Sequence, residues 1–470
     1  MIEQALIDSF ISLVGEKHAL TAKDDLTHYT HENRHIYVGQ TPLVLKPGST
    51  PEVAAIMKLA YETGTQIVPQ GGHTGHAAGA VPDESGSQIV LATERLNKIR
   101  EIDLAGNTMT AEAGVILQTI QEAAEGNDRL FPLSLGSQGS CMIGGNISSN
   151  AGGTGVLAYG NTRELVLGME VVLPNGDIWN GLRKLKKDNT GYAMKHLFIG
   201  AEGTLGVVTA AVLKLFPKPK GRVVAWAGVA NPSPALEILN SALSAAGSNL
   251  TGFELIHRTP LDFVLQSMPG SRDPLAGKHE WYVLAEFSSG RSDAGARELA
   301  ENIFADALER GLGQDAVISG SLAEFAAMWK LREDMGEAQT HHGASIKHDI
   351  SVPVHRIPDF LEKAGPEVMR VVPGARLCVF GHLGDGNVHY NVSQPVGGDS
   401  RAFLEMRHEV NAAVHAILAD MEGSISAEHG IGRLKRDLLA QTKSPVELAM
   451  MRAVKQALDP KGIMNPGKVV

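Results

Sequence analysis

Two short segments contain the residues most capable of catalysis. The first is Gly381-His382-Leu383-Gly384-Asp385-Gly386-Asn387-Val388-His389-Tyr390-Asn391, and the second is Ala427-Glu428-His429-Gly430-Ile431-Gly432. The first is typical of a β-hairpin, because apolar runs flank a turn rich in Gly, Asp and Asn. If the turn is symmetric, His382 and His389 lie directly opposite each other, with Cβ atoms about 5 Å apart. Both imidazoles would then reach one cation.

A carboxylate from Glu428 would complete a His-His-Glu ligand set with open coordination positions. Such a set is typical of a catalytic metal site rather than a closed structural one. His429 follows directly in the sequence and is then a natural proton acceptor beside the metal. Asn391 lies two residues after His389, and therefore on the same face of its strand. The alternative is that these are ordinary strand and loop histidines without a ligand.

Two glycine-rich segments indicate a binding site for a diphosphate. One runs from Pro69 to Gly79, after an expected strand at 66–68, and the other runs from Gly136 to Gly160. Glycine lets the backbone approach a ligand closely, and successive N–H groups form an anion-binding concavity. The alternative of a flexible linker is disfavoured, because strand and helix patterns flank both segments. Gly153-Thr154-Gly155-Val156-Leu157-Ala158 matches the dinucleotide fingerprint formally, but no strand precedes it, so we reject that interpretation.

Length and composition exclude several classes of protein. A chain of 470 residues should hold two or more domains with ample core. Its 43% hydrophobic and 20% charged residues are typical of a globular protein. The formal net charge of −10 and a pI near 6.0 argue against a nucleic-acid binder. No apolar run approaches the ~20 residues of a membrane helix.

The cellular compartment follows from the N-terminal segment and the cysteines. Residues 1–20 combine acidic residues with helical apolar spacing, which fits neither a signal peptide nor an Arg-rich transit peptide. Two cysteines, Cys141 and Cys378, provide neither a disulfide framework nor a Cys-x-x-Cys zinc site. We therefore expect a cytoplasmic protein.

Alternating elements place the glycine-rich segments in an N-terminal α+β domain that ends near Phe216. Here we expect helices at 51–63, 117–125 and 189–199, and strands at 42–46, 88–92, 108–111, 170–173 and 206–215. From Arg222 a second region follows, with strands at 223–229, 252–255 and 280–287 and helices at 233–246, 292–309 and 321–338. This rhythm predicts an antiparallel sheet with helices on one face, a ferredoxin-like layout. The hairpin and helices at 400–421 and 445–458 complete the chain.

With these motifs in place, the sequence resembles the FAD-linked 2-hydroxyacid dehydrogenases of the vanillyl-alcohol-oxidase type, the branch typified by D-2-hydroxyglutarate and D-lactate dehydrogenases. The resemblance covers nearly the whole chain. Besides the two catalytic segments and the loop at 69–79, it rests on residues 135–137, 150–153, 160–163, 200–206, 329–333 and 465–468.

The resemblance implies an α+β protein in three parts. A two-subdomain FAD-binding domain (vanillyl-alcohol-oxidase/PCMH type) is expected at 1–217. A ferredoxin-like substrate and metal-binding cap domain is expected at 218–430, and a C-terminal segment, 431–470, is expected to return to the FAD domain. The pyrophosphate of FAD would lie in the two glycine-rich loops and its ring between the domains. The expected FAD-binding residues are Pro69, Gln70, Gly71, Gly72, His73, Thr74, Gly75, Gly79, Leu135, Gly136, Ser137, Gly144, Gly145, Ser149, Asn150, Gly152, Gly153, Glu202, Gly203, Gly206, Val207 and Asn465.

The resemblance also implies roles in the reaction. The metal, most simply Zn²⁺, is expected on His382, His389 and Glu428, with His429 as the general base. By the same analogy Arg332 and Lys347 bind the substrate carboxylate, for which a guanidinium fork is suited, and Asn391 helps to hold the substrate. The implied reaction oxidises a D-2-hydroxy acid, D-2-hydroxyglutarate first, to the 2-oxo acid by hydride transfer to flavin. Electron-transfer flavoprotein or a quinone would accept the electrons, and a homodimer is expected.

Two positions depart from the family pattern. Gly336 stands one turn after Arg332, where the family branch usually has a Thr that helps to hold the distal carboxylate. This puts the preference for 2-hydroxyglutarate over malate or lactate in doubt. His73 stands where near relatives usually have Asn, and distant members of the superfamily attach FAD covalently through such a His. We expect non-covalent FAD, and the neighbouring His76 is equally compatible with a surface position.

Other functions remain as alternatives. Within the family these are a D-lactate or D-malate dehydrogenase and, behind them, a peroxide-forming oxidase. A metallohydrolase would use His382, His389 and Glu428 to activate water, but would leave the glycine-rich loops without a role. A flavin or metal carrier would explain the loops but not the combination of Arg332, Lys347 and His429.

Overall fold

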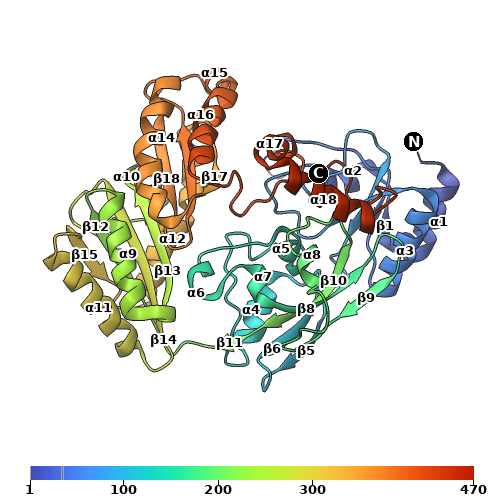
Figure 1. Ribbon diagram of the computed structural model, residues 1–470, viewed down its shortest axis with the longest axis horizontal. Coiled ribbons are helices and arrows are strands. Elements are labelled where there is room, and N and C mark those ends of the chain that lie inside the picture. The colour runs from blue at the N-terminus through green and yellow to red at the C-terminus, as the bar shows by residue number, and fades with distance from the viewer. Residues whose placement is uncertain (1, 33, 35) are drawn as a thin grey trace. The chain divides into compact units, whose positions relative to one another are not determined.

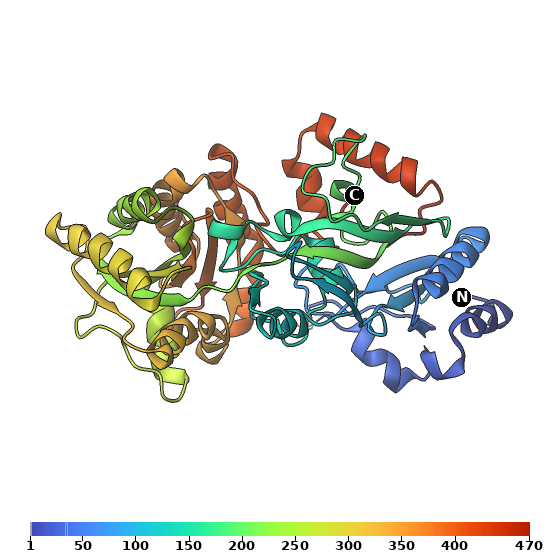
Figure 2. The ribbon, with the colours of Figure 1, turned by 90° about the horizontal axis from the view of Figure 1, so that it is seen from below.

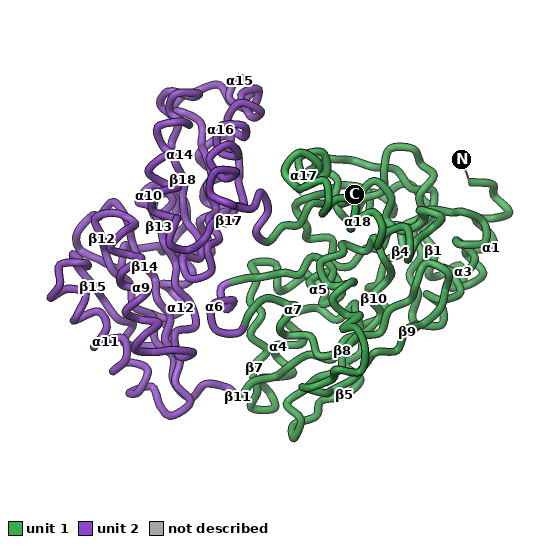
Figure 3. Tube along the Cα trace, in the orientation of Figure 1, with its two compact units in different colours: residues 1–153, 160–217, 428–470 green, residues 154–159, 218–427 purple. Residues whose placement is uncertain are grey.

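The computed structural model describes residues 2–32, 34 and 36–470, and these form two compact units (Figures 1 and 3). Unit 1 comprises Met1–Gly153, Gly160–Pro217 and Glu428–Val470, and unit 2 comprises Thr154–Tyr159 and Lys218–Ala427. Residues 1, 33 and 35, part of the expected first domain, lie outside the described residues. The three domains expected at 1–217, 218–430 and 431–470 stay a prediction, because compactness alone does not define a domain.

Unit 1 contains two main sheets. In the four-stranded sheet, parallel pairing joins the last three strands of the order β1 (Ala19–Leu20), β2 (Val44–Leu45), β4 (Gln88–Ala92) and β3 (Gln66–Gln70). The five-stranded sheet is antiparallel, in the order β5 (Ile99–Asp103), β6 (Thr108–Glu112), β10 (Val207–Lys214), β8 (Val166–Val172) and β9 (Ile178–Gly181). A small ladder pairs β7 (Arg129–Leu130) with β11 (Phe216–Pro217).

Helix α3 of unit 1 (Thr50–Thr63) begins and ends where local signals predict. The Ser49 side chain accepts a hydrogen bond from the N–H of Glu52, Pro51 stands in the first turn, and Gly64 ends the helix in the left-handed region. These caps account for the agreement between the expected helix at 51–63 and α3. The helices of unit 1 are α1 (Gln4–Val14), α2 (Lys23–Thr30), α3 (Thr50–Thr63), α4 (Leu117–Glu125), α5 (Ile143–Ser149), α7 (Thr162–Leu165), α8 (Lys195–Phe198), α17 (Arg436–Thr442) and α18 (Pro445–Leu458).

The C-terminal segment belongs to unit 1, and in Figure 2 its red helices lie beside green segments of that unit. The N–H of Ile67 donates to the carbonyl of Ile463, and the N–H of Asn465 donates to the carbonyl of Ile67. Met464 thereby forms a parallel bridge beside β3, and it is fully buried.

Unit 2 is built on one eight-stranded sheet. Its order is β15 (Asp315–Ile318), β12 (Gly221–Val229), β14 (Trp281–Ser289), β13 (Leu250–His257), β18 (Arg376–His382), β19 (Asn387–Ser393) and β16 (Ser345–Ile346), and β17 (Asp349–Ser351) also pairs with β19. All its pairs are antiparallel, as expected. The helices are α6 (Val156–Tyr159), α9 (Pro232–Ala246), α10 (Arg258–Ser267), α11 (Asp293–Glu309), α12 (Leu322–Glu333), α13 (Met335–Ala338), α14 (Ile357–Val371), α15 (Ser400–Glu405) and α16 (Arg407–Asp420).

Helices cover both faces of the unit 2 sheet, so the expectation of helices on one face is wrong. Alternate strand residues such as Ala225 and Phe253 join one core with α9, α11, α14 and α16. The intervening residues, such as Trp226 and Ile256, join a second core with α10, α12 and α13. This second face carries the side chains that matter below. Among the described residues, no helix is long and apolar enough to span a bilayer.

Three expected helices differ from the observed ones. Of the helix expected at 189–199, only α8 forms, because Asp188 accepts from the N–H of Thr190 in a turn and Gly191 has a φ of 92°. The helix expected at 321–338 is interrupted at Asp334 between α12 and α13, and the one expected at 400–421 is interrupted at Met406. Within the glycine-rich segment 136–160, α5 and α6 replace what was expected to be loop.

Candidate active site

A hollow with about 920 Å³ of empty space, which includes its opening to solvent, lies within unit 1. The loop after β3, helix α5 and the turn before β10 form its wall. The lining residues are Pro69, Gln70, Gly71, Gly72, His73, Thr74, Gly75, Ala77, Gly79, Ala80, Thr93, Cys141, Met142, Gly144, Gly145, Asn146, Ser148, Ser149, Glu202, Gly203, Gly206, Val207, Val208 and His429.

Glycines shape this hollow in two ways. A Cβ on Gly72 would lie 2.1 Å from the carbonyl oxygen of Ser140, and one on Gly144 would lie 2.7 Å from the Cβ of Ala113. Glycine is therefore required for the loop and α5 to pack this closely. A Cβ on Gly75 or Gly145 would meet no atom within 4 Å, so these two residues leave open space. Such space lets a ligand approach the backbone.

Two buried amide side chains suggest that the hollow is completed by a ligand. The Oδ1 atom of Asn146 and the Oε1 atom of Gln70 are buried, and no described residue donates a hydrogen bond to either. Buried polar atoms nearly always have partners. A molecule with N–H or hydroxyl donors would supply them. FAD has such donors on its ring and ribityl chain, so the residues present fit this group.

The hollow brings together most of the residues expected to bind FAD. Those that line it are Pro69, Gln70, Gly71, Gly72, His73, Thr74, Gly75, Gly79, Gly144, Gly145, Ser149, Glu202, Gly203, Gly206 and Val207. Seven others lie outside its lining, and their role stays a prediction; they are Leu135, Gly136, Ser137, Asn150, Gly152, Gly153 and Asn465.

Glu202 has a structural task in this wall. Its two carboxylate oxygens accept hydrogen bonds from the N–H groups of Ile431 and Gly432, each at 2.7 Å. Burial raises the pKa of Glu202, and these two N–H groups oppose that rise. The carboxylate thereby holds the loop that begins at His429, whose side chain also lines the hollow and packs edge-on against His76 at 4.9 Å.

Asn465 ties the same region together from the C-terminal segment. Its Nδ2 donates to the carbonyl of Gly79 and to the carbonyl of Glu202, each at 2.8 Å. Asn465 is buried and has a φ of 42°, a conformation that Asn tolerates better than most residues. Asn465 therefore stabilises the wall of the hollow without lining the hollow itself.

His73 lines the hollow, in a left-handed conformation with φ of 57°. Its Nε2 lies 2.5 Å from the carbonyl oxygen of His31, so this nitrogen carries a proton and donates it. Burial lowers the pKa of His73, which keeps the ring neutral near pH 7. One of its two ring nitrogens is thus already engaged.

In unit 2, the hairpin forms as expected but with a different register. The turn is centred one residue earlier than a symmetric loop about residues 385–386, because the N–H groups of Asp385 and Gly386 both donate to the carbonyl of His382. His389 therefore pairs with Phe380 rather than with His382, and the expectation that the two histidines are directly opposite is wrong. They are diagonal neighbours on the same face, with ring centroids 6.1 Å apart.

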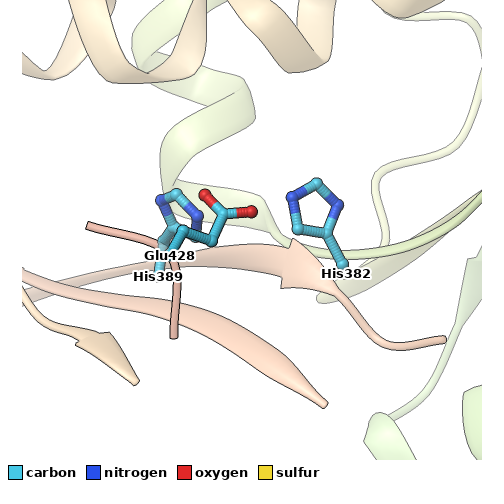
Figure 4. A group of neighbouring side chains, drawn as sticks. All are labelled: His382, His389 and Glu428. Atoms are coloured by element: carbon cyan, nitrogen blue, oxygen red, sulfur yellow. The ribbon is translucent and has the colours of Figure 1, made fainter. Parts of the chain in front are cut away.

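The side chains of His382, His389 and Glu428 form a candidate metal group (Figure 4). One ligand atom from each lies within 4.8 Å of the others. Glu428 directly follows Ala427, whose N–H donates to the carbonyl of Asp349 on β17. The donor set, two imidazoles and one carboxylate, suits a catalytic divalent metal.

Arg332 and His382 share a buried carboxylate. Glu254 of β13 is the cross-strand partner of His382, and it is fully buried. One of its oxygens contacts Nδ1 of His382, and the other accepts from Nε of Arg332 at 2.5 Å. Burial alone would raise the pKa of Glu254, but Arg332 and His382 together lower it to about 2. The guanidinium of Arg332 also lies 4.7 Å from the ring of Phe380.

The other two expected substrate residues lie further along the same face. Asn391 is buried, and its Nδ2 donates to Oε1 of Gln339, which is itself fully buried. Its cross-strand partner is Cys378. Burial raises the pKa of the Cys378 thiol to about 12, and the charge of Lys347 opposes that rise. Lys347 is exposed and near enough for its charge to act on this thiol.

Gly336 lies in α13 with open space beside it. A Cβ at this position would meet no atom within 4 Å, and the backbone has no positive φ. A side chain can therefore be added without a clash. The missing Thr is a chemical difference and not a consequence of crowding.

Sequence reasoning missed two residues of this face, Glu254 and Gln339. Glu254 had a visible signal, because it stands inside the apolar run Gly252-Phe253-Glu254-Leu255-Ile256. A charged residue at a buried strand position needs a partner. Gln339 follows a helix in a polar stretch and had no comparable signal.

Comparison with known proteins agrees with this organisation. Residues 41–181 match the family described as "FAD binding domain", and residues 218–469 match "FAD linked oxidases, C-terminal domain". Among solved structures, p-cresol methylhydroxylase is similar with a TM-score of 0.76 at 18% identity, over 99% of this chain and 96% of that one. An alkyldihydroxyacetonephosphate synthase is similar with a TM-score of 0.75 at 16% identity, over 99% and 86%. At these identities the likeness shows the fold, which confirms the expected vanillyl-alcohol-oxidase/PCMH type.

Curated relatives are more similar in sequence. The mitochondrial D-2-hydroxyglutarate dehydrogenase of Arabidopsis thaliana is 35% identical over 99% of this chain and 81% of its own length. The D-2-hydroxyglutarate dehydrogenase of Xanthomonas citri pv. viticola is 37% identical over 96% and 93%. A D-2-hydroxyglutarate–pyruvate transhydrogenase of Saccharomyces cerevisiae is 34% identical over 96% and 90%. The chain thus belongs to the FAD-linked 2-hydroxyacid dehydrogenase family and is an FAD-linked oxidoreductase.

Proposed function

We propose that this protein oxidises D-2-hydroxyglutarate to the 2-oxo acid with FAD and a divalent metal, most simply Zn²⁺. The observation that carries the proposal is the group of His382, His389 and Glu428 in a chain whose relatives, matched over nearly its whole length, are named for that substrate. A metallohydrolase would use the same three ligands, but a family of FAD-linked oxidoreductases leaves no reason to prefer it.

FAD would be held by the glycine-lined hollow of unit 1. Gly75 and Gly145 leave room for the backbone to approach it, and Asn146 and Gln70 offer buried acceptors. Bound FAD supplies a two-electron acceptor for the hydride on C2 of the substrate. We propose non-covalent attachment; Nε2 of His73 is already bonded to the carbonyl of His31, so only Nδ1 could form a covalent bond.

The metal would be held by His382, His389 and Glu428. A bound divalent metal lowers the pKa of an oxygen acid by several units, which would favour deprotonation of the substrate hydroxyl. His429, next to Glu428 in the sequence, is proposed to take that proton. The hydroxyl oxygen loses a proton and C2 loses a hydride, and together these losses oxidise the alcohol to a ketone.

The substrate's carboxylates would be held by Arg332, Lys347 and Asn391. Because Nε of Arg332 is bonded to Glu254, its two Nη atoms are the donors available to a carboxylate. Fixing the carboxylate orients the C2–H bond, and such positioning contributes several kcal/mol in general.

We propose electron-transfer flavoprotein or a quinone as the electron acceptor. The name of the yeast relative indicates that a second 2-oxo acid, pyruvate, is an acceptor for that protein. A homodimer and a cytoplasmic location stay predictions. Gly336 offers no hydroxyl to the distal carboxylate of D-2-hydroxyglutarate, which favours D-lactate, an acid without that carboxylate, or the shorter D-malate as a second candidate substrate.

The first test is spectroscopic. Under anaerobic conditions, D-2-hydroxyglutarate should bleach the visible absorption of the bound flavin, and D-malate and D-lactate should do so more slowly. A flavin that stays oxidised with all three would contradict the proposed reaction, and a colourless protein would contradict the cofactor.

Replacing His389 with Ala should remove the metal while the flavin stays bound, because the imidazole is a ligand in unit 2 and the hollow lies in unit 1. Activity should fall by more than the roughly 10- to 100-fold typical of losing an outer-shell partner. Elemental analysis and flavin absorbance on the same sample provide the measurement. Full activity in a metal-depleted variant would rule out the metal's role.

His429→Asn is the companion variant, next to a ligand but not one itself. Removing a general base should slow flavin reduction by about 10²- to 10⁴-fold. Metal content should match that of the wild-type protein. Unchanged reduction kinetics in a stopped-flow experiment would refute the assignment of the base.

Gly336→Thr should strengthen the preference for 2-hydroxyglutarate. The open space at this position accepts the side chain, and a hydroxyl bonded to a carboxylate contributes about 1.5–3 kcal/mol, or roughly 10- to 100-fold. We expect KM for D-2-hydroxyglutarate to fall while KM for D-lactate stays the same, since lactate has no distal carboxylate. Equal changes for both substrates would argue against this role of position 336.

Gly145→Val should reduce flavin binding, and the added Cβ itself meets no protein atom within 4 Å. Its side chain would project into open space at the wall of the hollow, where the ligand is proposed to approach. The ratio of flavin to protein after dialysis measures the effect. Gly290→Val is a matched control, because Gly290 also faces open space but lies in unit 2, outside the hollow. Equal flavin content in both variants would argue against this wall as the binding surface.

A further inference from the structure

Glu254 is a fully buried acid in the sheet of unit 2, and the proposed function gives it no task. It stands on β13, directly opposite the last residue of β18, which is His382. Its side chain lies on the sheet face that α12 covers, the face that also carries His389 and Asn391. Burying a carboxylate costs several kcal/mol unless its partners compensate, so its position calls for an explanation.

Each oxygen of Glu254 serves a different partner. One contacts Nδ1 of His382, and the other accepts from Nε of Arg332 at 2.5 Å. An ionised carboxylate has only acceptors. When His382 is neutral, as binding of a metal requires, its ring proton must therefore sit on Nδ1, which leaves the lone pair on Nε2. In Figure 4 the ring nitrogen of His382 that is remote from its Cβ points toward the other two side chains of the metal group.

The same carboxylate fixes the orientation of Arg332. Its Nε–H points at Glu254, and its guanidinium lies 4.7 Å from the ring of Phe380. Phe380 in turn stacks on His389, with ring centroids 5.2 Å apart. With one edge of the guanidinium engaged and one face packed, only the Nη edge remains for a substrate carboxylate.

We propose that Glu254 is a positioning residue that sets the tautomer of His382 for metal binding and the direction of Arg332 for substrate binding at the same time. The inference rests on the proposed metal site and substrate site and assigns a residue that supports both. Metal-binding histidines in general donate their second ring N–H to such an outer acceptor, and losing it weakens metal binding by about 10- to 100-fold.

Glu254→Gln tests this without changing the shape of the side chain. An amide has one acceptor and one donor, whereas both partners of Glu254 need an acceptor. If the amide oxygen keeps Arg332, its N–H₂ faces Nδ1 of His382 and forces the proton to Nε2. If the oxygen keeps His382, the N–H₂ opposes the N–H of Arg332. Either arrangement disturbs one of the two sites.

Zn²⁺ dissociation constants should be measured on the full-length, flavin-loaded protein after chelation, by titration with zinc alone. We expect Glu254→Gln to weaken zinc binding by about 10- to 100-fold and to raise KM for D-2-hydroxyglutarate. In the metal-free protein, ¹⁵N-histidine spectra, with the His382 signal assigned by its loss in His382→Asn, should show Nδ1–H in the wild type. The variant should populate the Nε2–H form.

Glu286→Gln is the matched control. Glu286 lies on the neighbouring strand β14, is 6% exposed, and is held by Arg222, Thr251 and Trp329, each at 2.8 Å. It touches neither His382 nor Arg332 through any bond among the described residues. The same exchange of carboxylate for amide should leave zinc affinity and the His382 tautomer as in the wild type.

The outcomes separate this inference from the proposed function. Zinc binding that is lost in His382→Ala but unchanged in Glu254→Gln, with the tautomer unchanged, would overturn the role of Glu254 and leave the metal site standing. A wild-type protein that binds no zinc would overturn the proposed metal site instead. If Glu254→Gln does not fold, Glu254→Asp retains the charge one methylene further from both partners. It should weaken zinc binding and raise KM while Nδ1–H persists, and unchanged values would overturn the inference.

Discussion

A charge buried inside an apolar sheet has to be matched by fixed partners, and in unit 2 this requirement falls on Glu254. Solvent cannot stabilise the carboxylate, so His382 and Arg332 must hold it, one at each oxygen. The constraint acts in both directions, because the bonds to Glu254 also restrict His382 and Arg332 to one orientation each. Strand pairing places Glu254 opposite His382, and α12 brings Arg332 over the same face. The directions of a proposed metal ligand and of a proposed carboxylate donor thereby depend on one side chain.

Much of this arrangement could be predicted from the sequence. The glycine-rich loop after β3 and the hairpin at 381–391 are local patterns, and local patterns determine their own geometry. The register of the hairpin was predicted wrongly, but the conclusion that His382 and His389 lie on the same face still holds. Pairing shifted by two residues, and an even shift keeps His382 and His389 on the same face of the sheet. Capped helices such as α3, which starts after Ser49 and ends before Gly64, were placed well for the same reason.

What could not be predicted depends on contacts between distant parts of the chain. The sequence gives no indication that Glu254 meets residues 78 and 128 positions away. Helix α10 on the second face of the sheet was missed, because it lacked strong end signals and the strands' alternation was not followed to both faces. The helix expected at 189–199 failed because an Asp188 turn and Gly191 outcompeted helix propensity. Of the residues that the motifs predict to bind FAD, most line the hollow, whereas Asn465 lies outside its lining and bonds to Gly79 in its wall.

The bonds of Asn465 also have a consequence for how the protein is made. They span 386 residues to Gly79 and 263 residues to Glu202, and all of unit 2 beyond its short helix α6 is encoded between Glu202 and Glu428. The ribosome therefore synthesises the glycine-rich loops long before it synthesises Met464, which forms the bridge beside β3, and Asn465, whose amide bonds to these loops. Unit 2, whose segment from 218 to 427 is continuous, can fold while the chain is still being elongated. The hollow of unit 1 can therefore reach its final form only after Asn465 has been synthesised, so a cofactor that needs the finished hollow has to bind after that point.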